Sequence, residues 1–351
     1  MVHSRINGGG NTRSEELRER SCEEAMAGHA GGPLADFWHP VALSADVGEK
    51  PIPATLLGTP LVIWRTAQGV FAFKDLCIHR GTRLSLGWVD QGQLVCPYHG
   101  WCYGESGAVT RIPAIPVERP IPAKARAEKY HCQERYGLVF VCLGEPRVPI
   151  YKVPEFEQEG FRTHIVGPFR WKASAARSTE NFMDEAHLPW AHPDSLGNRD
   201  NIPPIPNREV TERAGAFYFE CNSEVRSRLD KAKMTTNRLT YDIVLPFTIY
   251  HENIYPEGDR VIDLFFVSPL SERESVRYMV VARNFALDQS PDKLIKFTEG
   301  IWEQDRVLVE SQRPEEIPID WSAELHVRGP DGPSMVYRRK LLEMGISTKN
   351  A

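Results

Sequence analysis

The sequence lacks the long apolar runs and the excess of positive charge that mark several classes of protein. No stretch approaches the roughly 20 apolar residues that a membrane-spanning helix requires. The first thirty residues are polar and carry glutamates as well as arginines, unlike a secretory leader. Lys and Arg number 42 against 47 Asp and Glu, a formal net charge of -5 that provides no basic surface for nucleic acid. We therefore expect a cytoplasmic protein that binds neither membrane nor nucleic acid.

Cysteine is also scarce, and two cofactor motifs are absent. The 351 residues contain 7 cysteines, an odd number that argues against a disulfide framework and for thiols that are free or bound to metal. The chain has no G-x-G-x-x-G after a predicted strand and no plant-type C-x4-C-x2-C pattern. Any nicotinamide, flavin or ferredoxin chemistry must therefore lie on separate proteins.

The pattern of apolar residues predicts two domains and a short preceding segment. Residues 1–35 mix glycine with charged residues, and we expect them to be mobile or peripheral. Residues 36–150 contain short apolar runs separated by glycine and proline, as in a small all-β domain. A proline-rich stretch, GEPRVPIYKVPEF, marks the linker. Residues 151–351 contain strand-like runs and then a helical pattern, PDKLIKFTEGIWEQDRVLVESQ. This order favours an α+β fold in which an antiparallel sheet carries helices on one face.

The β-rich half contains two paired metal-binding motifs. Cys77 and His79 form C-x-H, and Cys96 and His99 form C-x-x-H after an interval of sixteen residues. This combination is specific for a Rieske [2Fe–2S] centre, in which two thiolates hold one iron and two imidazoles hold the other. A zinc site is the weaker alternative, because zinc sites usually have two to four residues between paired ligands. The remaining cysteines are expected to be ordinary buried or surface thiols: Cys22, Cys102, Cys132, Cys142 and Cys221.

On these motifs, the chain from about residue 36 to its end resembles the terminal oxygenase component of the Rieske non-haem iron oxygenases. Cytochrome-type Rieske proteins share the ligand pattern but have an extra cysteine in each cluster loop. Here Thr82 and Tyr98 occupy those places. The resemblance implies an N-terminal Rieske domain followed by a helix-grip-like catalytic domain with a mononuclear iron.

The stretch ENFMDEAHLPWAH, residues 180–192, contains the next candidate site. His187 and His192 would lie about 140° apart on an unbroken helix, so we expect Pro189 to break or kink the helix and let both imidazoles point at one metal. By itself, a pair of histidines near a proline has a purely structural role about as often as it binds a metal. In the family resembled here, however, the motif acid-x3-Asp-x2-His-x4-His supplies two ligands of a mononuclear iron. Glu180, Asp184, His187 and His192 match it position for position.

The third ligand of such an iron should be a carboxylate, which leaves open positions for dioxygen on Fe(II). In the predicted helix near 292–312, Leu294, Ile301 and Leu308 form an apolar stripe that includes Asp305. An ionised acid on an apolar face needs a partner, and iron would be that partner. The family's ligand also lies in a late helix of the form E-x-D, matched here by residues 303–305. We expect the acids Glu303 and Glu310 to point away from the stripe.

The resemblance also implies roles for three neighbouring residues. Asp184 would join His187 to His99 of the adjacent subunit in a homotrimer, so that electrons cross between chains. Asn181 would hydrogen-bond near the iron, and Glu180 would be a structural acceptor. Four histidines lack a partner at ligand spacing and are expected to have ordinary surface or core roles: His131, His164, His251 and His326. Of these, His251 ends a predicted strand that could line a pocket.

The function implied is a terminal oxygenase with a Rieske cluster, mononuclear Fe(II) and O2 as co-substrate. Two electrons would come from a separate NAD(P)H-dependent reductase, a ferredoxin or both. The reaction would be monooxygenation of a small organic substrate, either hydroxylation or N- or O-demethylation through methyl hydroxylation. Chains of this length are similar to the homotrimeric vanillate, dicamba and caffeine demethylases and to saxitoxin-tailoring hydroxylases. We expect the substrate pocket along alternate residues of the strands near 239–285.

Two alternatives remain at this stage. A ring cis-dihydroxylating dioxygenase would share both metal motifs, although such enzymes generally have longer catalytic chains. A Rieske-type electron-transfer protein without catalysis would need only about the first 150 residues and would bind no mononuclear iron.

Overall fold

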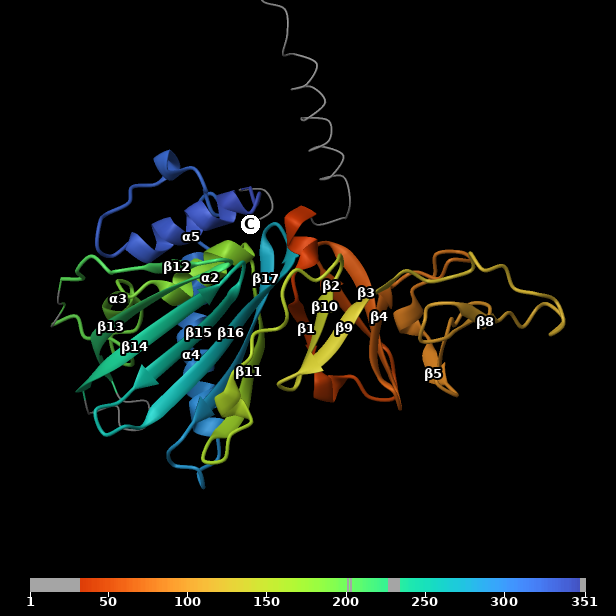
Figure 1. The fold of residues 1–351 in the computed structure, drawn as a ribbon, viewed down its shortest axis with the longest axis horizontal. Coiled ribbons are helices and arrows are strands. Elements are labelled where there is room, and N and C mark those ends of the chain that lie inside the picture. The colour runs from red at the N-terminus through yellow and green to blue at the C-terminus, as the bar shows by residue number, and fades with distance from the viewer. Residues whose placement is uncertain (1–31, 201, 203, 227–233, 348–351) are drawn as a thin grey trace, which may run out of the picture.

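The computed structural model describes residues 32–200, 202, 204–226 and 234–347, whose strands form three antiparallel sheets (Figure 1). Residues 1–31, most of the predicted peripheral segment, lie outside the described residues. The structure differs from that prediction at Gly32–Asp36, a 3-10 helix in which Leu34 and Ala35 are fully buried. The peripheral segment therefore ends before residue 35.

The N-terminal part contains two of the sheets. The larger has the order β1-β10-β9-β4-β3-β2 and consists of β1 (His39–Leu43), β2 (Ile52–Leu56), β3 (Thr59–Thr66), β4 (Gly69–Lys74), β9 (Lys129–Arg135) and β10 (Leu138–Cys142). The smaller consists of β5 (Trp88–Asp90), β6 (Gln93–Val95), β7 (Cys102–Tyr103) and β8 (Val109–Arg111). Short strands joined by tight turns are what the sequence predicted for this part.

The C-terminal part is organised around one seven-stranded antiparallel sheet with the order β11-β17-β16-β15-β14-β13-β12. Its strands are β11 (Arg162–Trp171), β12 (Thr211–Arg213), β13 (Ala216–Arg226), β14 (Met234–Val244), β15 (Thr248–Ile254), β16 (Arg260–Ser271) and β17 (Glu274–Arg283). From β13 to β17 each strand pairs with the next one in the chain, so the sheet is mostly a meander. Cross-strand neighbours are therefore fixed by successive hairpins.

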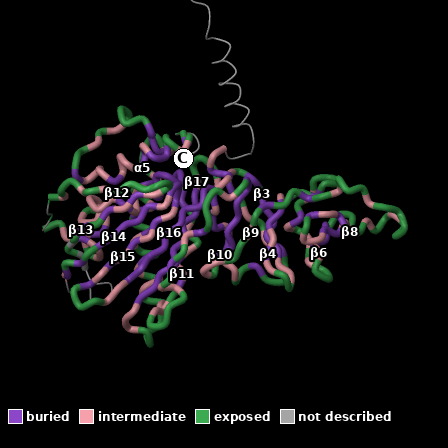
Figure 2. Tube along the Cα trace, viewed as in Figure 1, coloured by how far each residue is buried: buried purple, intermediate pink, exposed green. Residues whose placement is uncertain are grey.

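Both faces of this sheet are covered, as the continuous buried trace of its central strands shows (Figure 2). On one face, Phe265 of β16 belongs to a core that includes Trp302 and Tyr337 from the helices. On the other face, Phe266 packs against Phe140 of β10, with ring centroids 5.1 Å apart. Adjacent side chains of a strand point to opposite faces. The N-terminal sheet thus covers one face of the large sheet, and helices cover the other.

The helices are α2 (Ala175–Met183), α3 (Leu188–Ala191), α4 (Asp292–Val309) and α5 (Gly332–Glu343), with 3-10 turns at Ser44–Asp46, Leu84–Leu86, Pro154–Phe156 and Trp321–Ala323. The sequence predicted α4 closely, but gave no strong signal for α5. The weak amphipathic pattern of α5 explains this, because its buried residues include Arg338 and Lys340 as well as Tyr337. Both cations are paired with acids: Arg338 with Glu324, and Lys340 with the more exposed Glu212.

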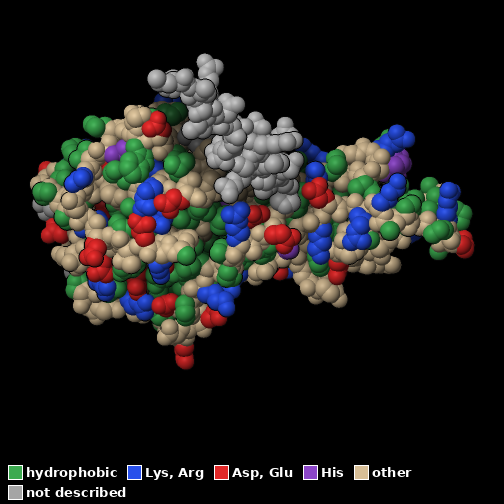
Figure 3. All heavy atoms as spheres, turned by 45° about the horizontal axis from the view of Figure 1, so that its top comes forward, with side chains coloured by type: hydrophobic (Ala, Val, Ile, Leu, Met, Phe, Trp, Pro, Cys, Tyr) green, Lys and Arg blue, Asp and Glu red, His purple; other side chains and the backbone are tan. Residues whose placement is uncertain are grey.

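No helix among the described residues is long and apolar enough to cross a membrane. On the face shown in Figure 3, basic and acidic side chains are interspersed, in keeping with the small net charge.

Candidate functional site

The two cysteine-histidine motifs occupy two loops of the same design beside the smaller N-terminal sheet. In residues 77–82, the Gly81 N–H donates to the Cys77 carbonyl at 2.8 Å; in residues 96–101, the Gly100 N–H donates to the Cys96 carbonyl at 3.0 Å. Gly81 and Gly100 have φ values of +73° and +67°. Residues with a Cβ rarely adopt this conformation. Each loop therefore contains a left-handed turn that favours glycine.

The loops place thiols inside and imidazoles outside. Cys77 and Cys96 are buried, whereas His79 and His99 are exposed, with ring centroids 4.7 Å apart. Trp101 stacks on His79 at 4.6 Å between ring centres. Burial raises the pKa of the Cys96 thiol, and the adjacent Cys77 raises it further. Two converging buried thiols and two adjacent exposed imidazoles fit a [2Fe–2S] cluster with unlike irons.

Tyr103, on β7, is a residue that the sequence analysis missed. Its hydroxyl oxygen accepts a hydrogen bond from the Ile78 N–H at 3.2 Å and lies 3.1 Å from the Cys77 sulfur. A thiolate at Cys77 that binds the cluster could only accept, so the Tyr103 O–H would then donate to it. Burial raises the pKa of Tyr103, and Cys77 adds to this effect. Hydrogen bonds to cluster sulfurs adjust the reduction potential. A Tyr four residues after His99, the last motif residue, carried no signal of its own in the sequence.

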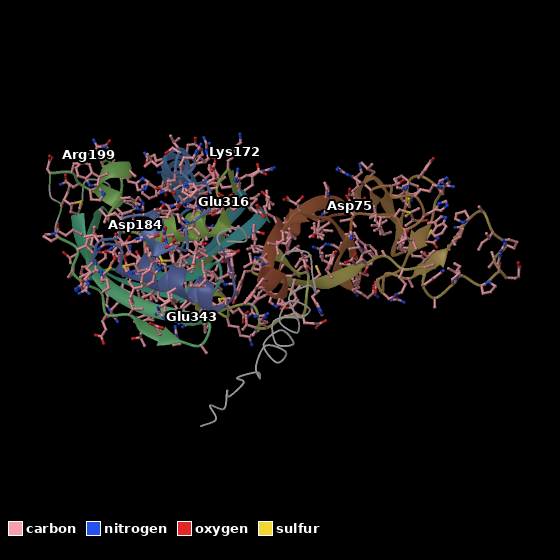
Figure 4. All side chains as sticks on the ribbon, turned by 90° about the horizontal axis from the view of Figure 1, so that it is seen from above. Asp75, Lys172, Asp184, Arg199, Glu316 and Glu343 are labelled. Carbon is pink, nitrogen blue, oxygen red and sulfur yellow. The ribbon has the colours of Figure 1, made fainter. Side chains whose placement is uncertain are left out.

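The second candidate site lies in the larger C-terminal part, where Figure 4 labels Asp184, apart from Asp75 in the N-terminal part. Helix α2 begins after Ser174, whose hydroxyl caps it by accepting the Arg177 N–H at 3.3 Å. It ends at Met183, so Asp184 is in extended conformation and not on a helix surface.

Pro189 differs from its predicted role as a helix breaker. It lies in the first turn of the four-residue helix α3, where a missing N–H costs nothing. His187 precedes this helix and His192 follows it. The two imidazoles converge because they flank a single turn, with ring centroids 5.3 Å apart.

Asp305 joins the two histidines from helix α4. Its Oδ1 lies 2.9 Å from Nε2 of His192 and 3.4 Å from Nε2 of His187. One ligand atom from each of the three residues falls within a group that spans no more than 4.8 Å. The structure therefore brings together the three residues that the sequence analysis nominated.

The orientation of Asp305 arises differently from the prediction. The buried face of α4 consists of Thr298, Trp302, Asp305 and Val309, whereas Leu308 is 50% exposed. The predicted position of Leu308 on the buried face was wrong. The buried face is rotated around the helix by about one residue and contains Val309 instead of Leu308, because Trp302 packs into the core. Glu303 does point outward and pairs with Arg306.

The three residues fit a metal cation. Nε2 of His192 and Oδ1 of Asp305 are buried and make no hydrogen bond to the described residues, despite their proximity. Burial lowers the pKa of His187, but Asp184 and Asp305 outweigh this and raise it. Burial raises the pKa of Asp305, yet His192, His187 and Arg277 lower it by more. Unpartnered ligand atoms in surroundings that favour positive charge are typical of a metal site, and two histidines with one carboxylate suit non-haem Fe(II).

The other nitrogen of each imidazole is also held. Nδ1 of His192 lies 2.7 Å from Oε1 of Gln304, and Nδ1 of His187 lies 3.2 Å from Oδ2 of Asp184. Both acceptors require Nδ1–H, which leaves the Nε2 lone pairs directed to the metal position. Gln304 lay inside the E-x-D match, but the sequence analysis gave it no role.

Asn181 and Glu180 have separate duties on α2. Oδ1 of Asn181 accepts a hydrogen bond from the buried Arg277 at 2.8 Å, and Asn181 lines the cavity above the triad. Glu180 accepts two hydrogen bonds from Arg338 of α5, each 2.7 Å long. Glu180 is thus the structural acceptor that the sequence analysis expected.

A cavity opens beside the triad, between the large sheet and α4. Phe182, Phe297, Ile301 and Trp302 contribute apolar surface to the cavity. Its sheet side is lined, as predicted, by strand residues: Leu239, Tyr241, His251, Asn253, Asp263 and Met279. Such a mixture of apolar lining and a few polar groups is typical of small-molecule sites. The sequence analysis expected His251 at the end of a strand, but it lies in the middle of β15.

Comparison with known protein families assigns both halves of the chain. Residues 37–125 match the Rieske [2Fe-2S] domain, and residues 171–345 match the vanillate O-demethylase oxygenase C-terminal domain. Both matches contain the candidate ligands of the corresponding site.

Similar proteins extend over nearly the whole chain. Methylxanthine N1-demethylase NdmA of Pseudomonas putida is 31% identical over 332 residues, which cover 92% of each chain. Methylxanthine N3-demethylase NdmB of the same organism is 27% identical, with 90% of each chain covered. The structure of NdmA with caffeine, from Pseudomonas putida CBB5, superimposes with a TM-score of 0.81 at 28% identity and covers 91% of this chain and 94% of that one. Dicamba monooxygenase bound to dicamba, at 20% identity and a TM-score of 0.72 over 89% of this chain and 97% of that one, shares the fold.

Proposed function

Since this chain belongs to the Rieske non-haem iron oxygenases, we propose that Cys77, His79, Cys96 and His99 hold its [2Fe–2S] cluster and that His187, His192 and Asp305 hold its mononuclear iron. The observation that carries this assignment is the convergence of two imidazole Nε2 atoms and one buried carboxylate beside an apolar cavity. The enzyme oxidises a small organic molecule with O2 and electrons from redox partners. When bound, the cluster relays electrons and the iron activates dioxygen.

The residues of the chain have distinct tasks in this reaction. Asp184 and Gln304 hold the imidazoles so that their Nε2 atoms face the metal. Arg277 fixes the amide of Asn181 at the cavity wall. Phe182, Trp302 and the neighbouring apolar side chains exclude water and hold the substrate carbon beside the metal.

The reaction we propose is demethylation of an N-methylated or O-methylated substrate. The enzyme hydroxylates the methyl carbon, and the resulting hemiaminal or hemiacetal releases formaldehyde. Similarity to two methylxanthine N-demethylases over at least 90% of this chain supports N-demethylation first.

The proposal includes a homotrimer and a separate NAD(P)H-dependent reductase, with or without a ferredoxin. The small sheet that carries the cluster loops lies at one end of the molecule, and helix α3 beside the triad lies at the other (Figure 1). Apolar side chains around the cluster loops are exposed: Leu76, Ile78, Leu86, Trp88 and Tyr98. Such a patch suits a partner surface. Contact between His99 and Asp184 of adjacent subunits would let electrons pass from one chain to the next.

The domain limits that we propose are 36–150 for the Rieske domain and 151–351 for the catalytic domain. None of the described cysteines is in a disulfide, which suits the cytoplasm that we propose as the compartment of the protein.

Metal analysis tests the assignment directly. Anaerobically purified enzyme should contain about three irons and about two acid-labile sulfides per chain, because a Rieske cluster holds two irons and the triad a third. Turnover of methylxanthines, methoxybenzoates and other methylated aromatics, driven by peroxide, should then release formaldehyde from at least one of them. Two irons in fully reconstituted enzyme would contradict the mononuclear site. Full iron content with an alcohol as the only product would replace demethylation by hydroxylation.

A further inference from the structure

A histidine-aspartate pair lies in the wall of the cavity, separate from the metal triad. His251 of β15 and Asp263 of β16 are direct cross-strand neighbours. Nδ1 of His251 lies 3.1 Å from Oδ2 of Asp263. His251 is 6% exposed and Asp263 is fully buried, and both line the cavity. Neither residue has a place in the metal site described above.

The hydrogen bond to Asp263 fixes which nitrogen of His251 carries the proton. A buried carboxylate is an acceptor only, so Nδ1 carries the hydrogen and Nε2 of the neutral ring presents a lone pair. That Nε2 is buried and has no hydrogen-bond partner among the described residues. Leaving a buried polar atom without a partner costs free energy. A binding group on the substrate would remove this cost.

The ring of His251 is held firmly in place. Tyr241, its cross-strand neighbour on β14, lies 4.6 Å away between ring centres, and Phe182 contacts it edge-on at 5.8 Å. These contacts leave the imidazole little freedom to turn Nε2 away from the cavity. The aromatic surroundings also suit a planar molecule.

The charges of the cavity argue against an anionic substrate. Among the described residues that line it there is no Lys or Arg, and the carboxylate of Asp263 adds negative charge. A substrate carboxylate would therefore be buried with no cationic side chain to pair with it, and burying an unpaired charge is unfavourable for binding.

We propose that His251, held by Asp263, selects an uncharged planar substrate through an N–H group that donates a hydrogen bond to Nε2. This inference rests on the proposed function and names the substrate class of the same cavity. An N–H heterocycle or lactam that also carries a methyl group is the class that fits. His251 is the binding residue, and Asp263 is a positioning residue that acts through it.

Matched ligand pairs test this in the intact, iron-loaded enzyme under anaerobic conditions. The probes are theobromine against caffeine, uracil against 1,3-dimethyluracil, and indole against 1-methylindole, with benzoate as the anion; affinities come from calorimetry. In at least one pair the N–H member should bind at least about tenfold more tightly than its N-methylated partner, a difference of about 1.4 kcal/mol. In His251→Leu this preference should fall to near unity. No preference in any pair, or benzoate as the tightest ligand, would overturn the proposal.

Asp263→Asn separates positioning from a purely structural role. An amide can donate to Nδ1, which moves the hydrogen to Nε2 and makes it a donor. The preference for the N–H members should then fall to near unity, because an Nε2–H cannot accept a hydrogen bond from their N–H groups. An unchanged preference would contradict the role of Asp263. The control is His131→Gln, a change in an exposed side chain on β9.

Iron and sulfide content of every sample separates this inference from the proposed function. Three irons per chain with no N–H preference would overturn the substrate class alone. Two irons per chain in the wild type would overturn the metal assignment, whatever the ligand preference.

Discussion

Arg277 donates a hydrogen bond of 2.8 Å to Asn181, which lines the cavity beside the metal triad. The same guanidinium donates to the hydroxyl and the carbonyl of Ser178 at 2.7 and 2.8 Å. Its carbon Cζ lies 3.2 Å from the centre of the Trp171 ring. Arg277 is 1% exposed, so a buried cation fixes the amide of Asn181 with Oδ1 toward the guanidinium and Nδ2 on the opposite side.

Replacing this buried cation should cost stability. We expect Arg277→Met to lower the free energy of unfolding by about 2–4 kcal/mol, because it removes hydrogen bonds to a charged group and leaves Ser178 and Asn181 without a donor. Arg170→Met is the control, since Arg170 lies on β11 in an exposed ion pair with Glu274. Denaturation in urea, followed by circular dichroism, measures both. Equal urea midpoints for the two variants would argue against a stabilising role of the Arg277 hydrogen bonds to Ser178 and Asn181.

Asp305→Ala should remove the mononuclear iron and leave the cluster intact. Loss of one of three ligands lowers the iron content from about three to about two per chain, while acid-labile sulfide stays at about two. Glu303→Ala lies on the exposed side of the same helix and should keep all irons. Iron loss from both variants would show that the helix, and not the carboxylate, holds the metal.

Asp184→Asn should slow turnover without emptying either metal site. The carboxylate orients His187 and, in our proposal, joins it to the adjacent subunit, and removing such a partner costs roughly 10–100-fold. Reduction of the cluster by dithionite should proceed as in the wild type, and peroxide should restore part of the turnover because it bypasses electron transfer. Asp288→Asn, at an exposed acid, is the control. A peroxide-driven rate as low as the reductase-driven rate would indicate damage to the iron site instead.

Tyr103→Phe should lower the reduction potential of the cluster. With Cys77 as a cluster-bound thiolate, the hydroxyl 3.1 Å from its sulfur donates to it and stabilises the reduced, more negative cluster. A hydrogen bond worth ~1 kcal/mol corresponds to a decrease on the order of 40 mV for one electron. Redox titration by visible absorption measures it, with Tyr130→Phe in the neighbouring sheet as control. An unchanged potential would mean that the Tyr103 O–H does not reach the cluster sulfur.

Acid should destabilise the protein through His39. Burial lowers the pKa of this histidine from 6.5 to about 4, although its hydrogen bond to the Leu34 carbonyl opposes the change. In the unfolded chain His39 therefore becomes protonated below pH 6.5, whereas in the folded chain it becomes protonated only near pH 4. Stability falls as the pH decreases through this window, by about 3 kcal/mol in total, and is unaffected above it.

His39→Gln should make the unfolding free energy less dependent on pH between 4 and 6.5. The control is His131→Gln, because His131 is 47% exposed in its side chain. Urea denaturation across this range compares the three proteins. The same pH dependence in His39→Gln and in the wild type would rule out His39 as the cause.

The sequence alone determined the features whose parts lie close together in the chain. The two cluster loops each combine a cysteine, a histidine and a glycine within six residues, so local turn geometry suffices to bring them together. Hydrophobic patterns likewise predicted strand-like runs in the C-terminal part, followed by helix α4. His187 and His192 needed only one intervening helical turn.

Tertiary structure decided whatever joins separate elements. Asp305 lies more than a hundred residues after His192, and packing around Trp302 set which face of α4 is buried. The pair His251 and Asp263 depends on the register of β15 and β16, because a shift by one residue would turn the two side chains to opposite faces. Arg277 reaches Asn181 only because β17 packs beneath α2. Residue types and spacing specify local geometry, but contacts across the sheet follow from pairing and packing of the whole chain.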